Sequence, residues 1–507
     1  MVERRTYPRR SMLLYATPRE DWGDVLPAQL TTKAQVNGYR FLLRRLEHAL
    51  IRRDVRMLHD PMRSQFRSLV VGLVLALLVL AGFGVYGLIK PQGTVGDSKI
   101  IVSKTAGAMY VVVDGRLHPV LNLASARLIS GSDESPKSIA EKKLTGYPRG
   151  PLLGIPGAPP ALPGPLSADT SQWTVCDMVS DDAAVTTVVA GEPELGDRVR
   201  AATTGDASLV TAGDDTYLIF DGKRARVDTG SVPVRRALGI DGAPVRTVSP
   251  GLLNSLPEVE PIVVPAISGA GTPSALGDDI SVGTVIKVTG LSGATTYYVA
   301  LGRGVQQVGE VAAEVIRQAD TAGGGTVPTM GPGALTGVDT IDELPVSDFP
   351  SVTPVLTDVD ADPVLCSAWV RSKDDHQAVQ SVLLGSTLPL GSKEAPVVLA
   401  GADGPGAGLD AVFVEPGRGH YIRVTGSEPD STRAESLFYV SDSGVRFGVP
   451  DQNTGIALGL GDSPVPAPWS IVSLLARGPT LSQSNALVSH DGMAPDLAGT
   501  QIGAPEN

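Results

Sequence analysis

The longest apolar run in the chain is Leu69–Ile89, 21 residues without a charge. As an α-helix this run would be about 31 Å long, roughly the hydrocarbon thickness of a bilayer. Because core helices of soluble proteins are seldom apolar on every face over this length, the run predicts one transmembrane helix. A cleaved secretory signal is disfavoured, since the run begins 68 residues into the chain and ends at Lys90-Pro91 without a small-residue cleavage site.

A second helical pattern precedes this run. Apolar residues recur there at steps of three and four, on one face of a helix, at Val36, Tyr39, Leu43, Leu46 and Leu50. Arginines fall mostly on the other faces, and Pro61 is expected to end or kink the helix. A basic amphipathic helix beside a membrane can lie on anionic lipid, dock on a partner protein or stay solvated. We favour docking on a partner, because the apolar face is long and regular.

The pattern changes after the apolar run. Short runs of Val and Ile alternate with turns, in a chain that holds 58 Gly and 40 Pro, which predicts many short strands. Four segments pair a tyrosine with a glycine five residues on: Tyr110 and Gly115, Tyr217 and Gly222, Tyr297 and Gly302, Tyr439 and Gly444. Asp114-Gly115 and Asp221-Gly222 are strong hairpin signals. Each segment is followed by a short helical pattern, so we infer four related α/β repeats at uneven spacing.

Two of the gaps between these repeats are long, and each holds one of the two cysteines, Cys176 and Cys366. We infer that both gaps contribute to one central domain, which a Cys176–Cys366 bridge would cross-link. Such a bridge would close a loop of nearly 200 residues and stabilise the fold by a few kcal/mol. The alternative is two unrelated buried thiols, which would suit a cytosolic body.

These patterns divide the chain as follows. The predicted ranges are 1–34 flexible basic lead, 35–68 amphipathic helix, 69–89 transmembrane helix, 97–158 repeat 1, 171–212 first segment of the central domain, 213–265 repeat 2, 275–345 repeat 3, 350–415 second segment of the central domain, 416–481 repeat 4, and 482–507 extended tail. Pro156–Pro165 is interpreted as a linker.

Charge is distributed unevenly. Residues 1–68 carry 14 Lys and Arg against 7 Asp and Glu, a balance of +7, so the remainder must carry −19 to give the net charge of −12. A basic segment before a span belongs on the cytoplasmic side, which predicts a cytoplasmic N-terminus and a body outside the membrane. Nucleic-acid binding is disfavoured, because it requires clustered Lys and Arg on the body.

The chain does not contain the sequence motifs of P-loop nucleotide sites, zinc proteases or serine hydrolases. There is no P-loop, since Gly222-Lys223 is followed by Arg224, and no H-E-x-x-H or G-x-S-x-G. Gly82, Gly84 and Gly87 fit a dinucleotide fingerprint, but they lie inside the predicted span. We therefore predict no catalytic residue and no metal ligand.

Several segments resemble the EccB component of mycobacterial type VII (ESX) secretion systems. They are TTKAQVNGYRFLLRRLEHALIRRDVRM at residues 31–57, KPQG after the span, LHPVLNLASARLI at 117–129 and RGPLLGIPGAP at 149–159. The resemblance covers about residues 30–480. It implies a single-pass inner-membrane protein with a periplasmic body of four repeats around a central domain. It also implies an internal disulfide, which matches Cys176–Cys366.

The resemblance further implies a complex with the EccC motor ATPase, EccD, EccE and other EccB copies, as a dimer or a higher ring. Such complexes export WXG100, PE and PPE proteins. The expected fold is mixed α/β, with a short cytoplasmic helix, one transmembrane helix and an elongated periplasmic region of four repeats around a β-rich domain. We expect a structural membrane subunit.

The alternative activity is ATP hydrolysis, which has been described for members of the family. ATP is a possible ligand by resemblance alone, and no residue here is assigned to it. A third possibility, a membrane-anchored cell-wall hydrolase, has no paired-carboxylate or nucleophile signature in the sequence.

Overall fold

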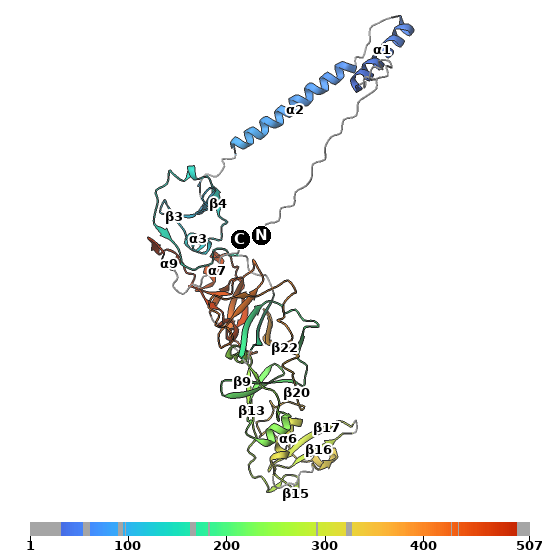
Figure 1. Cartoon of the computed structure of the whole chain (residues 1–507), viewed down its shortest axis with the longest axis vertical. Helices are drawn as coiled ribbons and strands as arrows, with labels where there is room; N and C mark the ends of the chain where they lie inside the picture. Colours follow the sequence, from blue (N-terminus) through green and yellow to red (C-terminus); the bar gives the residue numbers. More distant parts are fainter. Residues whose placement is uncertain are drawn as a thin grey trace, which may run out of the picture. The chain divides into compact units, whose positions relative to one another are not determined.

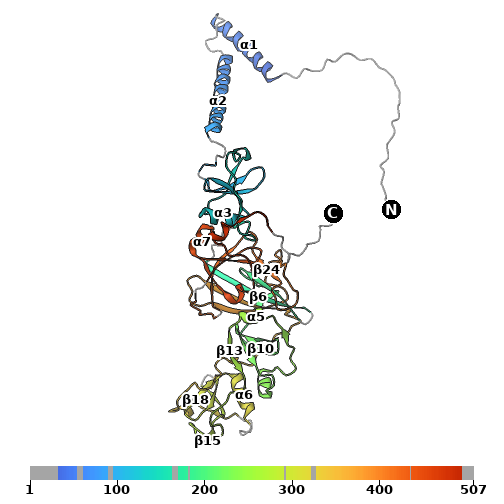
Figure 2. The same cartoon turned by 90° about the vertical axis from the view of Figure 1, so that its left-hand side faces the viewer.

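The structure is a computed structural model. It describes residues 32–53, 61–89, 95–96, 98–162, 169–180, 183–290, 293–320, 327–426, 428–433 and 436–493. The chain divides into two compact units, residues 1–91 and 92–507. Figures 1 and 2 show the elements of each unit from two sides.

The described residues of the first unit form two helices, α1 (Lys33–Arg52) and α2 (Pro61–Ile89). A capping box between Thr32 and Gln35 starts α1, and Arg53 ends it in the left-handed region at φ 48°. The predicted amphipathic helix therefore stops earlier than expected, and Pro61 begins the next helix. This is the position where proline costs least, because the first helical residues need no intrahelical N–H bond.

The second unit contains four sheets of similar build, which we call modules 1 to 4. Module 1 (residues 95–162) has β1 (Ile100–Ser103), β2 (Met109–Val113), β3 (Arg116–Pro119), α3 (Leu123–Ser130), β4 (Lys137–Ile139), η1 (Glu141–Lys143) and β5 (Leu152–Leu153). Module 2 (residues 206–262) has β9 (Asp206–Ala212), β10 (Asp215–Phe220), β11 (Lys223–Val227), α4 (Val232–Leu238), β12 (Arg246–Thr247), α5 (Pro250–Ser255) and β13 (Glu258–Ile262).

Module 3 (residues 285–330) has β16 (Val285–Thr289), β17 (Thr295–Ala300), β18 (Val305–Val308), α6 (Glu310–Ala319) and β19 (Thr329–Met330). Before it come β14 (Pro273–Ser274) and β15 (Gly277–Ser281), and after it η2 (Pro332–Leu335) and β20 (Val355–Leu356). Module 4 (residues 420–481) has β25 (His420–Thr425), β26 (Leu437–Val440), β27 (Val445–Val449), α7 (Gln452–Ala457), β28 (Val465–Pro468), α8 (Trp469–Val472) and β29 (Ala476–Arg477).

All four modules share one order of elements. Three antiparallel strands are followed by a helix, and a fourth strand then returns parallel to the first, as β4 does beside β1 and β28 beside β25. Modules 2 and 4 add a short helix and a strand parallel to the third. The mixed α/β fold class is confirmed. The shared order supports the repeat hypothesis, while the ranges given for the repeats stay a prediction; β9, for example, pairs with β10 rather than with the central sheet.

The central sheet has seven strands in the order β23-β24-β7-β6-β21-β22-β8. They are β6 (Thr170–Ser180), β7 (Ala183–Ala190), β8 (Val199–Ala201), β21 (Val364–Ser372), β22 (Val379–Gly385), β23 (Val397–Val398) and β24 (Ala411–Val414). These strands come from both long gaps of the sequence. Cys176 and Cys366 lie directly opposite each other on β6 and β21 and form the predicted disulfide, 190 residues apart. The opposite face of the same strand pair carries the buried Trp173 and Trp369.

Three apolar clusters join these sheets. One packs the central sheet against modules 2 and 4, through residues such as Trp173, Val210 and Ile422. A second joins module 2 to module 3, and a third joins module 1 to module 4. The modules are thus packed in two pairs, with the central sheet contacting one member of each.

Two segments are more ordered than predicted. Ile155, Ala158 and Leu162, within or beside the expected linker, are buried in the cluster between modules 1 and 4. In the expected extended tail, Ser482 caps the short helix α9 (Gln483–Ala486), and β30 (Ser489–His490) pairs with β5. Burial of apolar residues at Leu481 and Ala486 explains this order. Residues 494–507 of the predicted tail lie outside the described residues, as do 1–31 of the lead.

Candidate functional site

The predicted docking residues lie along α1 and are all exposed. Their exposed fractions are Val36 39%, Tyr39 65%, Leu43 48%, Leu46 61% and Leu50 76%. The stripe extends over 14 helical steps, about 21 Å. Its helix starts at a capping box, in which Thr32 and Gln35 satisfy backbone N–H groups of the first turn. An apolar stripe of this length is unfavourable in water.

Helix α2 is the candidate membrane span. Within the described residues of the chain it is the one helix long and apolar enough to cross a bilayer, over Gln65–Tyr86, and none of that window is buried by protein. Gly82 and Gly84 lie inside the helix, so the glycine pattern forms no phosphate-binding turn. The apolar surface on all sides requires lipid or other helices around it.

The predicted hairpin glycines fall into two groups. At Gly222 and Gly444 the backbone has positive φ, and a Cβ would lie 2.5 Å from the Gln380 carbonyl oxygen and 2.1 Å from Val412 Cγ1. Both neighbours belong to the central sheet, on β22 and β24. At Gly115 and Gly302 an added Cβ would meet nothing within 4 Å. The hairpins of modules 2 and 4 are therefore seated on the central sheet, and those of modules 1 and 3 are not.

The tyrosines that precede these glycines lie on the middle strand of each module. Tyr439 and Tyr110 are buried, whereas Tyr217 and Tyr297 are half-buried. The structure thus places the four pairs at equivalent positions of four sheets and does not gather them into one site.

Sequence reasoning missed two arginines that stand two residues after the seated glycines. Arg224 Nη2 lies 2.8 Å from Glu258 Oε2 and its Nη1 3.0 Å from Asn254 Oδ1. Arg446 donates from Nε to the Leu475 carbonyl at 3.1 Å, and its guanidinium lies 4.9 Å from the Trp469 ring centre. Each arginine ties a hairpin to the short helix that follows in its module. Because both arginines stand two residues after a predicted turn glycine, this shared spacing could have identified them from the sequence.

A buried polar network connects the central sheet to module 2. The Asp177 carboxylate accepts hydrogen bonds from the Ser249 backbone N–H at 2.6 Å, the Ser249 hydroxyl at 3.0 Å and the Thr186 hydroxyl at 2.9 Å. Burial raises the pKa of Asp177 to about 6, although these hydrogen bonds oppose the shift. Ser249 also caps α5. Asp177 therefore fixes the start of this helix on the sheet.

His420 lies on β25 against the Trp173 ring, with ring centres 5.3 Å apart. Its Nε2 is enclosed and has no hydrogen-bond partner among the described residues. Burial lowers the pKa of His420 to about 4. This histidine is a neutral packing residue at the contact between module 4 and the central sheet.

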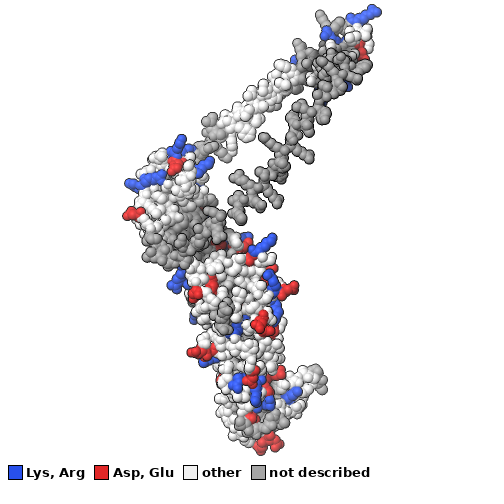
Figure 3. Space-filling model, viewed as in Figure 1, with Lys and Arg blue, Asp and Glu red and all other residues white. Residues whose placement is uncertain are grey.

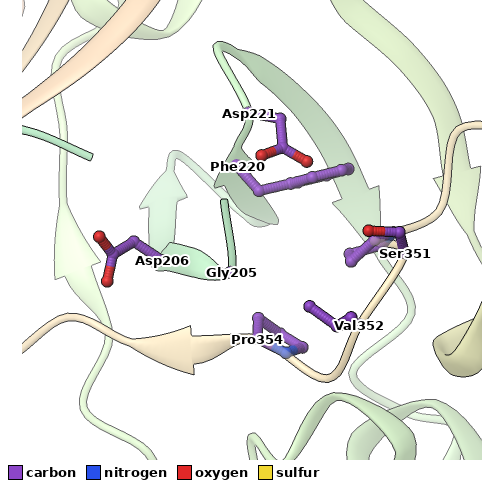
Figure 4. A pocket seen from close by; sticks show the side chains of 8 residues that line it. Gly205, Asp206, Phe220, Asp221, Ser351, Val352 and Pro354 are labelled. Carbon is purple, nitrogen blue, oxygen red and sulfur yellow. The ribbon is translucent and has the colours of Figure 1, made fainter. Parts of the chain in front are cut away.

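The body has a small hollow between module 2 and the segment before β20 (Figure 4). It is lined by Gly205, Asp206, Phe220, Asp221, Pro350, Ser351, Val352 and Pro354, and its volume is about 10 Å³. That is about the space one water needs. Its lining contributes two aspartates and no Lys or Arg, a charge that disfavours a triphosphate. The geometry here does not fit ATP.

Comparison with known proteins places these features in context. The model of the family described as "Type VII secretion system ESX-1, transport TM domain B" matches residues 28–495. The curated protein "ESX-3 secretion system ATPase EccB3" of Mycobacterium tuberculosis is 38% identical over 496 residues, covering 92% of this chain and 90% of that protein. "ESX-5 secretion system ATPase EccB5" of Mycobacterium marinum is 35% identical over 492 residues, covering 94% and 97%.

Solved structures agree. A chain of an intact ESX-5 inner membrane complex matches with a TM-score of 0.73 at 34% identity, covering 95% of this chain and 100% of that chain. A chain of the EccB3 dimer from the ESX-3 core complex matches with a TM-score of 0.68 at 34% identity, covering 77% and 100%.

Proposed function

This chain belongs to the EccB family of type VII (ESX) secretion systems, and on that premise we propose that it is a structural membrane subunit of such a complex. It anchors the complex through α2 and assembles its periplasmic region through the body, in a machine that exports WXG100, PE and PPE proteins. The observation that carries the proposal is α2 itself. An unburied apolar helix of this length, joined to a large internally packed body, is an anchor rather than a catalytic element.

We propose that the N-terminus is cytoplasmic and the body periplasmic. The +7 balance of residues 1–68 supports this orientation. The Cys176–Cys366 bridge is consistent with it, because disulfides persist in oxidising compartments. A reporter that is active only outside the cytoplasmic membrane, fused after residue 100, should be active. A stably expressed but inactive fusion would overturn the orientation.

We also propose that the exposed stripe of α1 docks on partner proteins. The expected partners are the EccC motor ATPase, EccD and EccE, with further copies of the chain itself. The stripe supplies apolar surface that no described residue of the chain covers. Purification of the tagged full chain from membranes tests the assignment: the partners should be retained, and a chain that elutes alone from mild detergent would contradict it.

The alternative is an ATP-hydrolysing subunit, which the names of the matched relatives suggest. Against it stands the missing P-loop. The full chain should show no hydrolysis that persists through a second purification column. Activity that co-elutes with the chain through both columns would favour the hydrolase.

A further inference from the structure

Module 1 is the basic region of an acidic body. Residues 95–162 contain eight Lys and Arg against five Asp and Glu, whereas the chain after residue 68 carries −19 overall. Figure 3 shows several Lys and Arg side chains on the described surface of this module. A local excess of positive charge in such a body calls for an explanation other than solubility.

Three of these lysines gather at one end of the module's sheet. Strands β1 and β4 run parallel with Ser103 opposite Ile139, so both end at the same edge. Lys104 follows β1, and its backbone N–H donates to the Ile139 carbonyl at 2.9 Å. Lys142 and Lys143 belong to η1, which begins two residues after β4. All three lysines are exposed.

An aromatic side chain completes this surface. Tyr147 lies one turn beyond η1, where its backbone N–H donates to the Leu144 carbonyl, and its exposed fraction is 37%. Exposed tyrosine beside lysine is the composition found where proteins meet lipid headgroups. Glu141 is also exposed here and offsets one of the positive charges.

The chain enters module 1 at an apolar cluster that also includes the residue after η1. Val95, the first described residue after α2, is buried in a small apolar cluster together with Leu144 and Ile139. Leu144 directly follows η1. In the sequence only residues 90–94 separate Ile89 from Val95, and a trans chain of that length reaches at most about 20 Å. Covalent connection alone therefore keeps module 1 within reach of a bilayer surface.

We propose that Lys104, Lys142, Lys143 and Tyr147, the basic patch, bind the anionic phospholipid headgroups of the membrane leaflet next to the body. Each lysine close to an anionic surface strengthens such binding about fivefold. The contact would hold module 1 against the bilayer, and through its packing on module 4 it would restrain the tilt of the body. The proposal requires an adjacent membrane but not a particular side of it, so it can fail while the proposed function stands.

The test uses the full chain in nanodiscs, labelled with a fluorophore at Gly146→Cys. A side chain at Gly146 meets nothing within 4 Å, so the label is tolerated there. Gly333→Cys on η2 is equally open and serves as the control position. Quenching by a nitroxide on a lipid headgroup should be at least about twofold stronger at 146 in discs with phosphatidylglycerol than in discs of phosphatidylcholine alone. Label 333 should show no difference.

Charge variants decide whether the patch is responsible. Lys104→Gln with Lys142→Gln should reduce the quenching at 146 to its phosphatidylcholine level, and salt at about 0.5 M should do the same to the unchanged chain. Arg236→Gln with Lys393→Gln removes the same charge from exposed sites elsewhere on the body and should have no effect. Equal quenching in both lipids would overturn the proposal, because tether length alone would then explain the proximity. Equal loss in the control variant would overturn it as well.

Discussion

The N-terminal unit and the body bury their apolar side chains in opposite ways. In α1 and α2 most of the large apolar residues are exposed, from Val36 to Val85. In the body, apolar residues are buried in continuous clusters that join the central sheet to its modules. The body is therefore stabilised by its own packing, whereas in our proposal the N-terminal helices are completed by lipid and by other proteins. Mutations in the N-terminal helices should therefore change partner binding, and mutations in the body should change its stability.

The largest expected effect concerns docking. Leu43→Asp with Leu46→Asp places charge in the exposed stripe of α1. Because burying one leucine contributes roughly 1.5–3 kcal/mol, the pair should weaken a docked interface by several kcal/mol. Partners should be lost when the tagged chain is purified from membranes, while the disulfide still forms. Arg44→Gln with Arg45→Gln, on the same helix but off the stripe, is the control. Co-purification of the aspartate variant at the wild-type level would contradict the docking surface.

The next effect concerns the body, where a substitution should lower stability and leave partner binding unchanged. Cys176→Ser with Cys366→Ser opens a loop of 190 residues and should lower the free energy of unfolding of the body by about 2–5 kcal/mol. Partner binding through α1 should be unchanged. Denaturant unfolding of the detergent-solubilised chain measures the free energy of unfolding, and co-purification measures partner binding. If unfolding is unaffected, the bridge does not hold the central sheet together.

A smaller effect separates the two kinds of hairpin within the body. Gly444→Ala adds a methyl group where Val412 already lies, in a backbone with positive φ, and should cost about 2–3 kcal/mol. Gly115→Ala has the same backbone strain and open space, so about 1 kcal/mol is expected. Both values come from denaturant midpoints. Equal losses would show that the close approach to β24 contributes nothing.

The smallest net effect is a pH dependence. The pKa of Asp177 rises on folding, from 3.8 to about 6, so its contribution to stability is fully present below pH 3.8 and is lost as pH increases through 6, by about 3 kcal/mol. The pKa of His420 falls to about 4, so its contribution is lost in the other direction, as pH decreases from 6.5 to 4. The two trends oppose each other in the native chain.

His420→Phe should uncover the Asp177 trend, making the body more stable at pH 4 than at pH 7. Adding Asp177→Asn should remove it again. Unfolding free energies at the two pH values measure this. If the His420→Phe variant is no more stable at pH 4 than at pH 7, the opposing trends of Asp177 and His420 are contradicted.

The sequence predicted features that depend on short stretches of chain. Leu69–Ile89 was recognisable because no charge interrupts it, and Asp114-Gly115 and Asp221-Gly222 because both turn residues adopt positive φ. Gly302 shows the limit: the turn of module 3 has no positive φ at this glycine, and its sequence pattern is correspondingly weak. The disulfide was predictable because the chain has only two cysteines.

Features built from distant segments could not be derived in this way. Gly444 was identified as a turn residue, but nothing near it in sequence indicates that Val412 lies against it. The bond from Ser249 to Asp177 joins residues 72 apart, and the contact of His490 with the Gly154 carbonyl joins residues 336 apart. Such contacts depend on how completed sheets pack, and no local pattern of polar and apolar residues specifies that.

The disulfide joins two neighbouring strands of the central sheet that are synthesised at well-separated times. Strand β6 leaves the ribosome first, and its partner β21 follows about 190 residues later. At about 5–20 residues per second this is a delay of about 10–40 s. During that interval Cys176 has no intramolecular partner, because the only other cysteine of the chain is Cys366. The bridge can therefore form only after modules 2 and 3 and the strand β21 have been made.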